Sequence, residues 1–164
     1  MANITTLKVT GTTHPTRASM FVPYVVDNYI NFADITTAKG SAVAAADTVE
    51  AITVPAGTAI LAAGLQCMVV DNATALTLDL GFTGGDVDEF VDGFDHAAAA
   101  AGDYSASLDT VPAITVVGAT ADTIDLLIAT LTDAPTAGQV RVWALLVDIS
   151  GKTDKAPAIA QLGS

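Results

Sequence analysis

The sequence predicts an all-β protein: a β-sandwich or jelly-roll-like single domain with extended terminal arms and one short helical excursion. Small and β-branched side chains dominate, with 31 alanines and 22 threonines, and such side chains suit thin, closely packed sheets. Most of the 18 acids are aspartates, which favour turns, and six Lys and Arg residues are too few to line exposed helices with ion pairs. Alternating apolar stretches recur about every 8 to 12 residues, with Gly, Pro, Asp and Asn between them.

The two ends of the chain are expected to be arms on a central domain. Residues 1–17 are polar and rich in threonine, which predicts an extended N-terminal arm with a short edge strand through Ile4. We expect the β-sandwich domain over residues 18–150. Its first strand contains Pro23, which cannot donate to a strand ladder, so this strand lies at a sheet edge or is interrupted there. Residues 151–164 are expected to form a C-terminal tail.

Alternating segments then predict the first core strands. Residues 48–54 alternate, and a turn at Pro55–Gly57 separates them from a long apolar run over residues 58–70. Gly64 inside that run predicts a bulge or bend that divides it into two short strands. Residues 74–80 show the clearest period of two, with three leucines on the inward face.

Two segments break the alternation. Residues 41–47 are small and predict a linker into the acidic part of the chain. Residues 81–102 contain five acids followed by five alanines, which predicts a surface excursion between strands. Within this excursion Val87, Phe90 and Phe94 fall at helical spacing, so we expect one or two helical turns there.

The last strands lie after residue 104. Residues 123–130 place three apolar side chains on one face, and the Pro- and Gly-containing turn at residues 134–138 follows. Residues 139–149 are apolar on both faces except at Arg141. This pattern is typical of a central strand that is covered on both sides.

Negative charge is concentrated in the middle of the chain. Residues 41–150 hold 15 acids and one base, Arg141, for a formal charge of −14, whereas each end carries +1. An acidic body repels nucleic acid and anionic membranes, so we expect neither as a partner. An acidic body with neutral-to-basic ends predicts a domain that is presented to solvent and tethered by its termini.

Nothing in the sequence predicts secretion, a membrane span or a disulfide bond. No basic segment followed by an apolar run opens the chain, and the longest apolar stretch, Ala59–Leu65, is far shorter than the ~20 residues of a membrane helix. We expect a soluble protein made in a cytoplasm. Cys67 has no second cysteine to pair with, and its apolar neighbours predict a core residue rather than a reactive thiol.

The acids of the excursion are the one candidate metal site. Calcium binds where several carboxylate oxygens converge, and Asp86, Asp88 and Asp92 are spaced closely enough to be considered. An EF-hand loop beginning at Asp86 would need Gly where Val91 stands and Glu where Ala97 stands. We therefore favour a solvated acidic loop, with a non-standard calcium site as the alternative.

The sequence offers no catalytic motif. His14 and His96 are the only histidines, and neither has a flanking metal or nucleophile motif. Aspartate pairs such as Asp122 and Asp125 occur in any acidic protein and act as catalysts only in a cleft. We predict that the protein is not an enzyme.

Five aromatic and basic residues have two interpretations each. Tyr24, Tyr29 and Phe32 either close one end of the core or form a subunit interface, where Tyr and Phe are favoured. Arg141 either pairs with an outward aspartate on a neighbouring strand or reaches across an interface together with Trp143. These five residues are the candidate interface.

Several short segments of the sequence resemble segments of predicted virion structural proteins of tailed bacteriophages, especially phages of aquatic bacteria. They include Asp47–Thr58, Thr83–Asp92, Asp122–Leu126 and Val140–Asp148, and the resemblance covers roughly residues 20–150. Among such proteins the chain resembles capsid decoration (cement) proteins. The resemblance implies a small β-rich domain that sits on the outer shell, often as a trimer, with arms spread over the major capsid protein.

The predicted function is therefore a non-enzymatic virion protein that binds the outside of the capsid shell as a homo-oligomer and stabilises it. Residues 1–35 and 151–164 are expected to contact the capsid or other subunits. The alternative is a tail or head fibre module that binds a receptor or glycan through residues 83–103. No cofactor is expected, apart from the calcium alternative.

Overall fold

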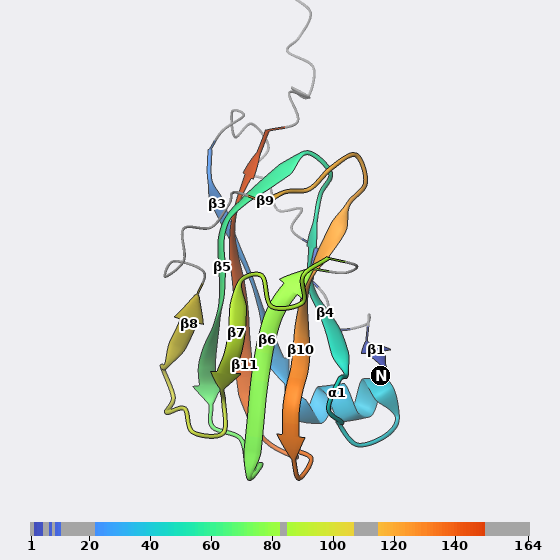
Figure 1. Ribbon diagram of the computed structural model, residues 1–164, viewed down its shortest axis with the longest axis vertical. Helices are drawn as coiled ribbons and strands as arrows, with labels where there is room; N and C mark the ends of the chain where they lie inside the picture. Colours follow the sequence, from blue (N-terminus) through green and yellow to red (C-terminus); the bar gives the residue numbers. More distant parts are fainter. Residues whose placement is uncertain are drawn as a thin grey trace, which may run out of the picture.

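The protein is built from two β-sheets packed face to face (Figure 1), so the all-β sandwich that the sequence predicts is confirmed. The structure is a computed structural model that describes residues 2–4, 7, 9–10, 22–82, 85–106 and 115–149. None of its described helices is long and apolar enough to cross a membrane.

Six strands form the first sheet, in the order β1-β4-β10-β6-β7, with β2 also paired to β4. They are β1 (Asn3–Ile4), β2 (Val9–Thr10), β4 (Thr48–Val54), β6 (Ala75–Phe82), β7 (Val91–Asp95) and β10 (Asp122–Thr132). The second sheet has the order β3-β11-β5-β8, with β9 also paired to β5. Its strands are β3 (Tyr24–Asn31), β5 (Thr58–Val69), β8 (Tyr104–Ala106), β9 (Thr115–Val116) and β11 (Gln139–Asp148).

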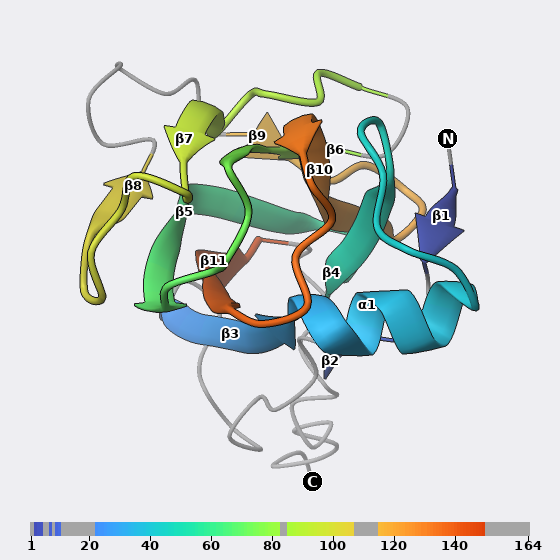
Figure 2. The same ribbon diagram turned by 90° about the horizontal axis from the view of Figure 1, so that it is seen from below.

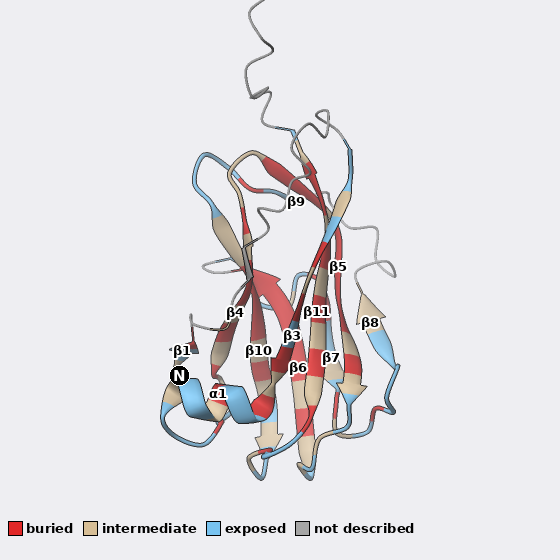
Figure 3. Ribbon diagram, turned by 180° about the vertical axis from the view of Figure 1, so that it is seen from behind, coloured by how far each residue is buried: buried red, intermediate tan, exposed pale blue. Residues whose placement is uncertain are grey.

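The hydrophobic core fills the space between the two sheets (Figure 3). Period-two alternation places one side of each long strand inward, and those side chains have no accessible surface in the middle of the sandwich. The fully buried residues of β6 and β10 are Leu76, Leu78, Leu80, Ile124, Leu126 and Ile128. The strong period of two predicted for residues 74–80 thus marks a true core strand.

Strand β11 lies at the centre of its sheet, between β3 and β5. Its inward side chains at Val140, Val142, Ala144 and Leu146 are fully buried. Its outward side chains at Arg141, Trp143 and Leu145 are only half-buried. The expected covering of both faces therefore holds for the inner face alone.

The helical turns expected within residues 81–102 are wrong, and the one helix among the described residues is α1 (Phe32–Lys39). Residues Val91–Asp95 form β7 and pair with β6 instead, and Gly93 adopts a left-handed φ of +70° that a helix does not allow. Helix α1 lies at the lower end of the sandwich, close to β1 (Figure 2). It ends at Gly40, whose φ of +74° and N–H bond to Thr36 O (2.9 Å) close the last turn.

The described part of the N-terminal arm adds two short parallel strands, β1 and β2, to the edge of β4. The buried amide of Asn28 holds this region in place by donating to Leu7 O at 2.6 Å and to Ala51 O at 3.0 Å. The rest of the arm after Thr10 and the tail over residues 151–164 lie outside the described residues.

Candidate interaction surface

The outer face of the second sheet gathers large apolar and aromatic side chains. We call it the aromatic face, and its residues are Val25, Asp27 and Tyr29 on β3, Gln66 on β5, Tyr104 on β8, and Arg141, Trp143 and Leu145 on β11. Residues that are register partners on neighbouring strands project from the same side of a sheet, which brings these eight together. Tyr104 is 74%, Val25 58% and Tyr29 49% exposed.

Arg141 occupies the middle of one row across this face, Tyr29–Arg141–Gln66–Tyr104. Its Nε donates to Asp27 Oδ2 at 2.8 Å, and its Nη1 donates to Gln66 Oε1 at 3.4 Å. The guanidinium carbon lies 5.9 Å from the ring centre of Tyr29, within the range of a cation–π contact. Arg141 therefore has the predicted aspartate partner on a neighbouring strand, and about a third of the pair remains exposed.

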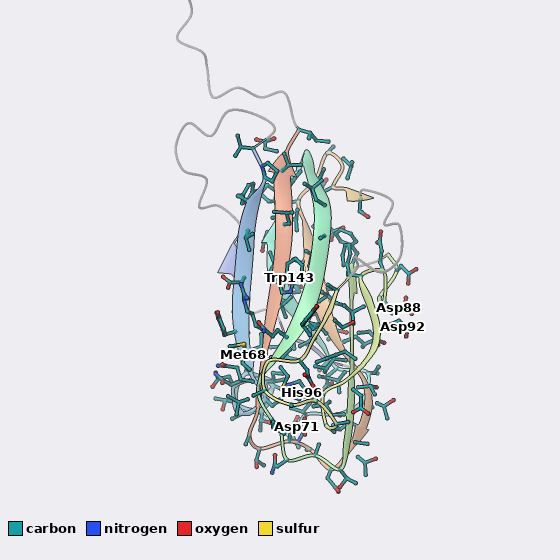
Figure 4. The ribbon with its side chains drawn as sticks, turned by 90° about the vertical axis from the view of Figure 1, so that its left-hand side faces the viewer. Met68, Asp71, Asp88, Asp92, His96 and Trp143 are labelled. Carbon is teal, nitrogen blue, oxygen red and sulfur yellow. The ribbon has the colours of Figure 1, made fainter. Side chains whose placement is uncertain are left out.

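Trp143 lies over the middle of the same sheet (Figure 4), where Gly64 leaves room for its indole ring. A Cβ added at Gly64 would lie 2.9 Å from Trp143 Cζ2 and 2.6 Å from Ser105 O, so only glycine fits there. The expected division of residues 58–70 at Gly64 is wrong, because β5 runs unbroken through it. The glycine serves close side-chain and strand packing instead of a bend.

The opposite sheet presents an acidic outer face. Asp92 and Asp95 on β7 are exposed, whereas Asp79 and Asp125 are buried, and Asp125 is in register with Glu50. None of the strands that the structure describes in this sheet contains Lys or Arg. Burial raises the pKa of Asp79, and the charge of Asp92 raises it further, although Gly93 N–H donates to its carboxylate at 2.8 Å. The two outer faces of the sandwich thus differ in chemistry.

Of the candidate calcium ligands, Asp92 lies on β7 and Asp88 just before it, and both are apart from Trp143 (Figure 4). A hydrogen bond with Asp86 and the negative charge of Asp86 raise the pKa of Asp88. Across the described ranges, no three His, Cys, Asp or Glu side chains group as a metal site requires. Calcium binding by Asp86, Asp88 and Asp92 stays a prediction.

His96 and Asp71 form a fully buried pair at the lower end of the core (Figure 4). Nδ1 of His96 lies 2.6 Å from Asp71 Oδ2, and Nε2 of His96 has no hydrogen-bond partner among the described residues. The edge of Phe32 packs on the imidazole at 5.1 Å between ring centres. Neither polar side chain is accessible, so the pair cannot meet a substrate and acts in the core.

A hollow of about 470 Å³ lies between the end of β7 and the start of β8. Its acids already serve the turn that forms its wall, because Asp95 accepts from Ala98 N–H at 3.0 Å and Asp103 accepts from Ala100 N–H at 2.8 Å. These carboxylates cap the turn, so neither serves the hollow as a catalytic group.

The fold is found in known phage particles. No protein-family model and no curated protein sequence matches the chain. A chain from the capsid of Ralstonia phage GP4 matches with a TM-score of 0.67 and 17% identity, over 90% of this chain and 98% of that chain. The chain shares its fold with a phage capsid component. A chain from the cyanophage Pam1 capsid asymmetric unit matches with a TM-score of 0.60 and 18% identity, over 82% of this chain and 90% of that chain.

The structure brings three of the five candidate interface residues together on the aromatic face: Tyr29, Arg141 and Trp143. Phe32 is 0% exposed and closes the lower end of the core, so it is not part of any surface. Tyr24 is half-buried on the inward side of β3. Burial and the charge of Asp148 raise the pKa of Tyr24.

The sequence interpretation missed Val25, Leu145 and Tyr104 as members of the aromatic face. Val25 and Leu145 are register partners, and their positions at odd numbers along β3 and β11 would have placed them with Tyr29 and Trp143. Tyr104 joins through the pairing of β8 with β5, for which the sequence carries no local signal.

Proposed function

We propose that this chain is a non-enzymatic structural protein of a phage particle, namely a capsid decoration (cement) protein that binds the outside of the capsid shell as an oligomer. The observation that carries this proposal is the fold shared with a chain of the Ralstonia phage GP4 capsid, which extends over 98% of that chain. A match over nearly the whole of both chains supports a similar role better than a shared substructure would.

The chemistry of the surface supports the same role. The described residues offer a buried His96–Asp71 pair and turn-capping aspartates, neither of which can process a substrate. They also offer one acidic sheet face and one aromatic sheet face, which suit a protein that shows one side to solvent and buries the other.

The proposed mechanism is stabilisation by mass action. A protein that binds only the assembled shell favours that shell by RT ln(1 + [L]/Kd), about 2.7 kcal/mol per site when its free concentration is 100 times Kd. The segments proposed to contact the capsid or other subunits are the neutral-to-basic residues 1–35 and 151–164.

Co-sedimentation with purified shells tests this function. Shells of the same phage that lack this protein are incubated with it and pelleted, and their melting is followed by light scattering. We expect saturable binding with a stoichiometry fixed by the shell lattice, and a rise in the shell's melting temperature. Binding to isolated tails or fibres in place of shells would support the fibre alternative and contradict the proposal.

A further inference from the structure

The centre of the aromatic face has the composition of a covered surface and yet is only half-buried. Strand β11 is apolar on both sides, as strands buried on both faces are. The sandwich covers its inner side, whereas Trp143 and Leu145 on the outer side are only half-buried. Tyr, Trp and Arg, which recur here, are the residue types that dominate the energetics of protein interfaces.

We propose that the aromatic face is the surface through which two copies of this chain associate, sheet against sheet. The inference deepens the proposed function, on which it rests, by naming the contact that joins the subunits of the oligomer. The distribution of charge indicates that the partner bound to this face is a second copy of the chain.

Charge leaves little choice of surface for self-association. Each copy carries a formal charge of −12, so two copies repel unless they meet where the local charge is balanced. Burying the opposite sheet would strip water from the exposed carboxylates of Asp92 and Asp95 on β7. The aromatic face carries one acid and one base, Asp27 and Arg141, and Arg141 is the only base within residues 41–150.

That acid and base also make the face self-complementary. The Arg141–Asp27 pair is about one-third exposed, so Arg141 of one copy can meet Asp27 of the other when the faces are opposed. Opposed tyrosine and tryptophan rings then fill the space around the charges.

The strands of the aromatic face supply about half of the area that a stable contact needs. Eight register pairs join β3 and β11, a length of about 27 Å, and four strands span about 14 Å before side chains are counted. A stable interface buries roughly 800 Å² per partner, close to a tenth of this chain's 8740 Å² accessible surface. The aromatic face supplies the centre of such a contact, and neighbouring loops supply its rim.

Two charge reversals test the inference by sedimentation velocity. Asp27→Arg gives the face two cations, and Arg141→Asp gives it two anions, so each variant alone is expected to be monomeric at concentrations where the wild type is oligomeric. An equimolar mixture of the two variants is expected to regain the wild-type mass, because opposite charges now face each other across the contact. The matched control, Asp92→Arg on the acidic side, is expected to keep the wild-type mass.

Far-ultraviolet circular dichroism checks that each variant is folded, which is expected because a partly exposed charge pair contributes little to stability. Tyr104→Ser removes a 74% exposed ring and is expected to weaken association about tenfold or more, with no change in the fold. A wild type that is monomeric at every concentration, or charge variants that keep the wild-type mass, would overturn the inference.

Shell binding separates this inference from the proposed function. If the wild type pellets with shells while both charge variants remain oligomeric, only the inference fails. If the wild type associates through the aromatic face but never pellets with shells, only the proposed function fails.

Discussion

Replacing Asp71 with alanine is expected to lower the free energy of unfolding by about 3–5 kcal/mol, because it leaves a buried imidazole with no partner. His96 and Asp71 are both inaccessible, and their 2.6 Å contact joins the end of β7 to the loop after β5. Asp71 Oδ1 also accepts from Ala73 N–H at 2.6 Å, so the same change releases the loop backbone. A loss of this size is a large part of the 5–15 kcal/mol that holds a typical domain together.

Urea denaturation measures the effect, and Asp71→Asn is the matched control. Asparagine keeps the size of the side chain and an oxygen for Ala73, and its amide still bonds the imidazole, so its loss should be clearly smaller. The site is also tight, since a Cβ added at Gly138 would lie 2.7 Å from that of Asp71. An alanine variant within about 0.5 kcal/mol of wild type would show that the pair is dispensable.

Replacing Asp47 with alanine is the second change with a large predicted loss, again about 3–5 kcal/mol. Asp47 is 1% exposed, and its carboxylate accepts from Lys39 Nζ, from Ala44 N–H at 2.9 Å and from Ala2 N–H at 3.1 Å. These bonds tie β1, the end of α1 and the loop before β4 to one another. Without the carboxylate, three donors lose their acceptor at once.

The contribution of Asp47 should depend on pH with a defined sign. Burial alone would raise the pKa of Asp47, but the bonds from Lys39, Ala44 and Ala2 outweigh it and hold that pKa below its usual value of 3.8. The stabilisation is therefore fully present above pH 3.8 and is lost as the pH falls through the lower, folded-state pKa.

Unfolding free energies of wild type and Asp47→Asn, measured from pH 7 down to pH 2, check this sign. We expect the gap between the two proteins to be constant above about pH 5 and to shrink below pH 4, because asparagine does not titrate. A gap that grows on acidification would contradict the assignment.

The features that depend on period-two alternation could be predicted from the sequence alone. The alternating leucines of residues 74–80 lie on the core strand β6, as predicted. The apolar residues 139–149 contain β11, which lies between two other strands of its sheet. The same alternation, carried from Tyr29 to Val25 and from Trp143 to Leu145, places most of the aromatic face. Alternation is a strong signal because a slip of one residue would turn every apolar side chain outward.

Features set by contacts between distant segments could not be predicted in this way. Val87, Phe90 and Phe94 have helical spacing, but the pairing of residues 91–95 with β6 overrides it, as tertiary packing often does. The segment at residues 41–47 looks like a linker, and nothing nearby signals that Asp47 binds Ala2 across 45 positions. The partner of His96 is likewise 25 positions away, at Asp71.

Imaging of decorated shells by cryo-electron microscopy, with and without this protein, bears most directly on its role. The proposal predicts added density on the outer surface at lattice-defined positions, into which the two-sheet domain fits with aromatic faces of adjacent copies in contact. Shells that look the same with and without the protein, or density confined to the tail, would contradict it.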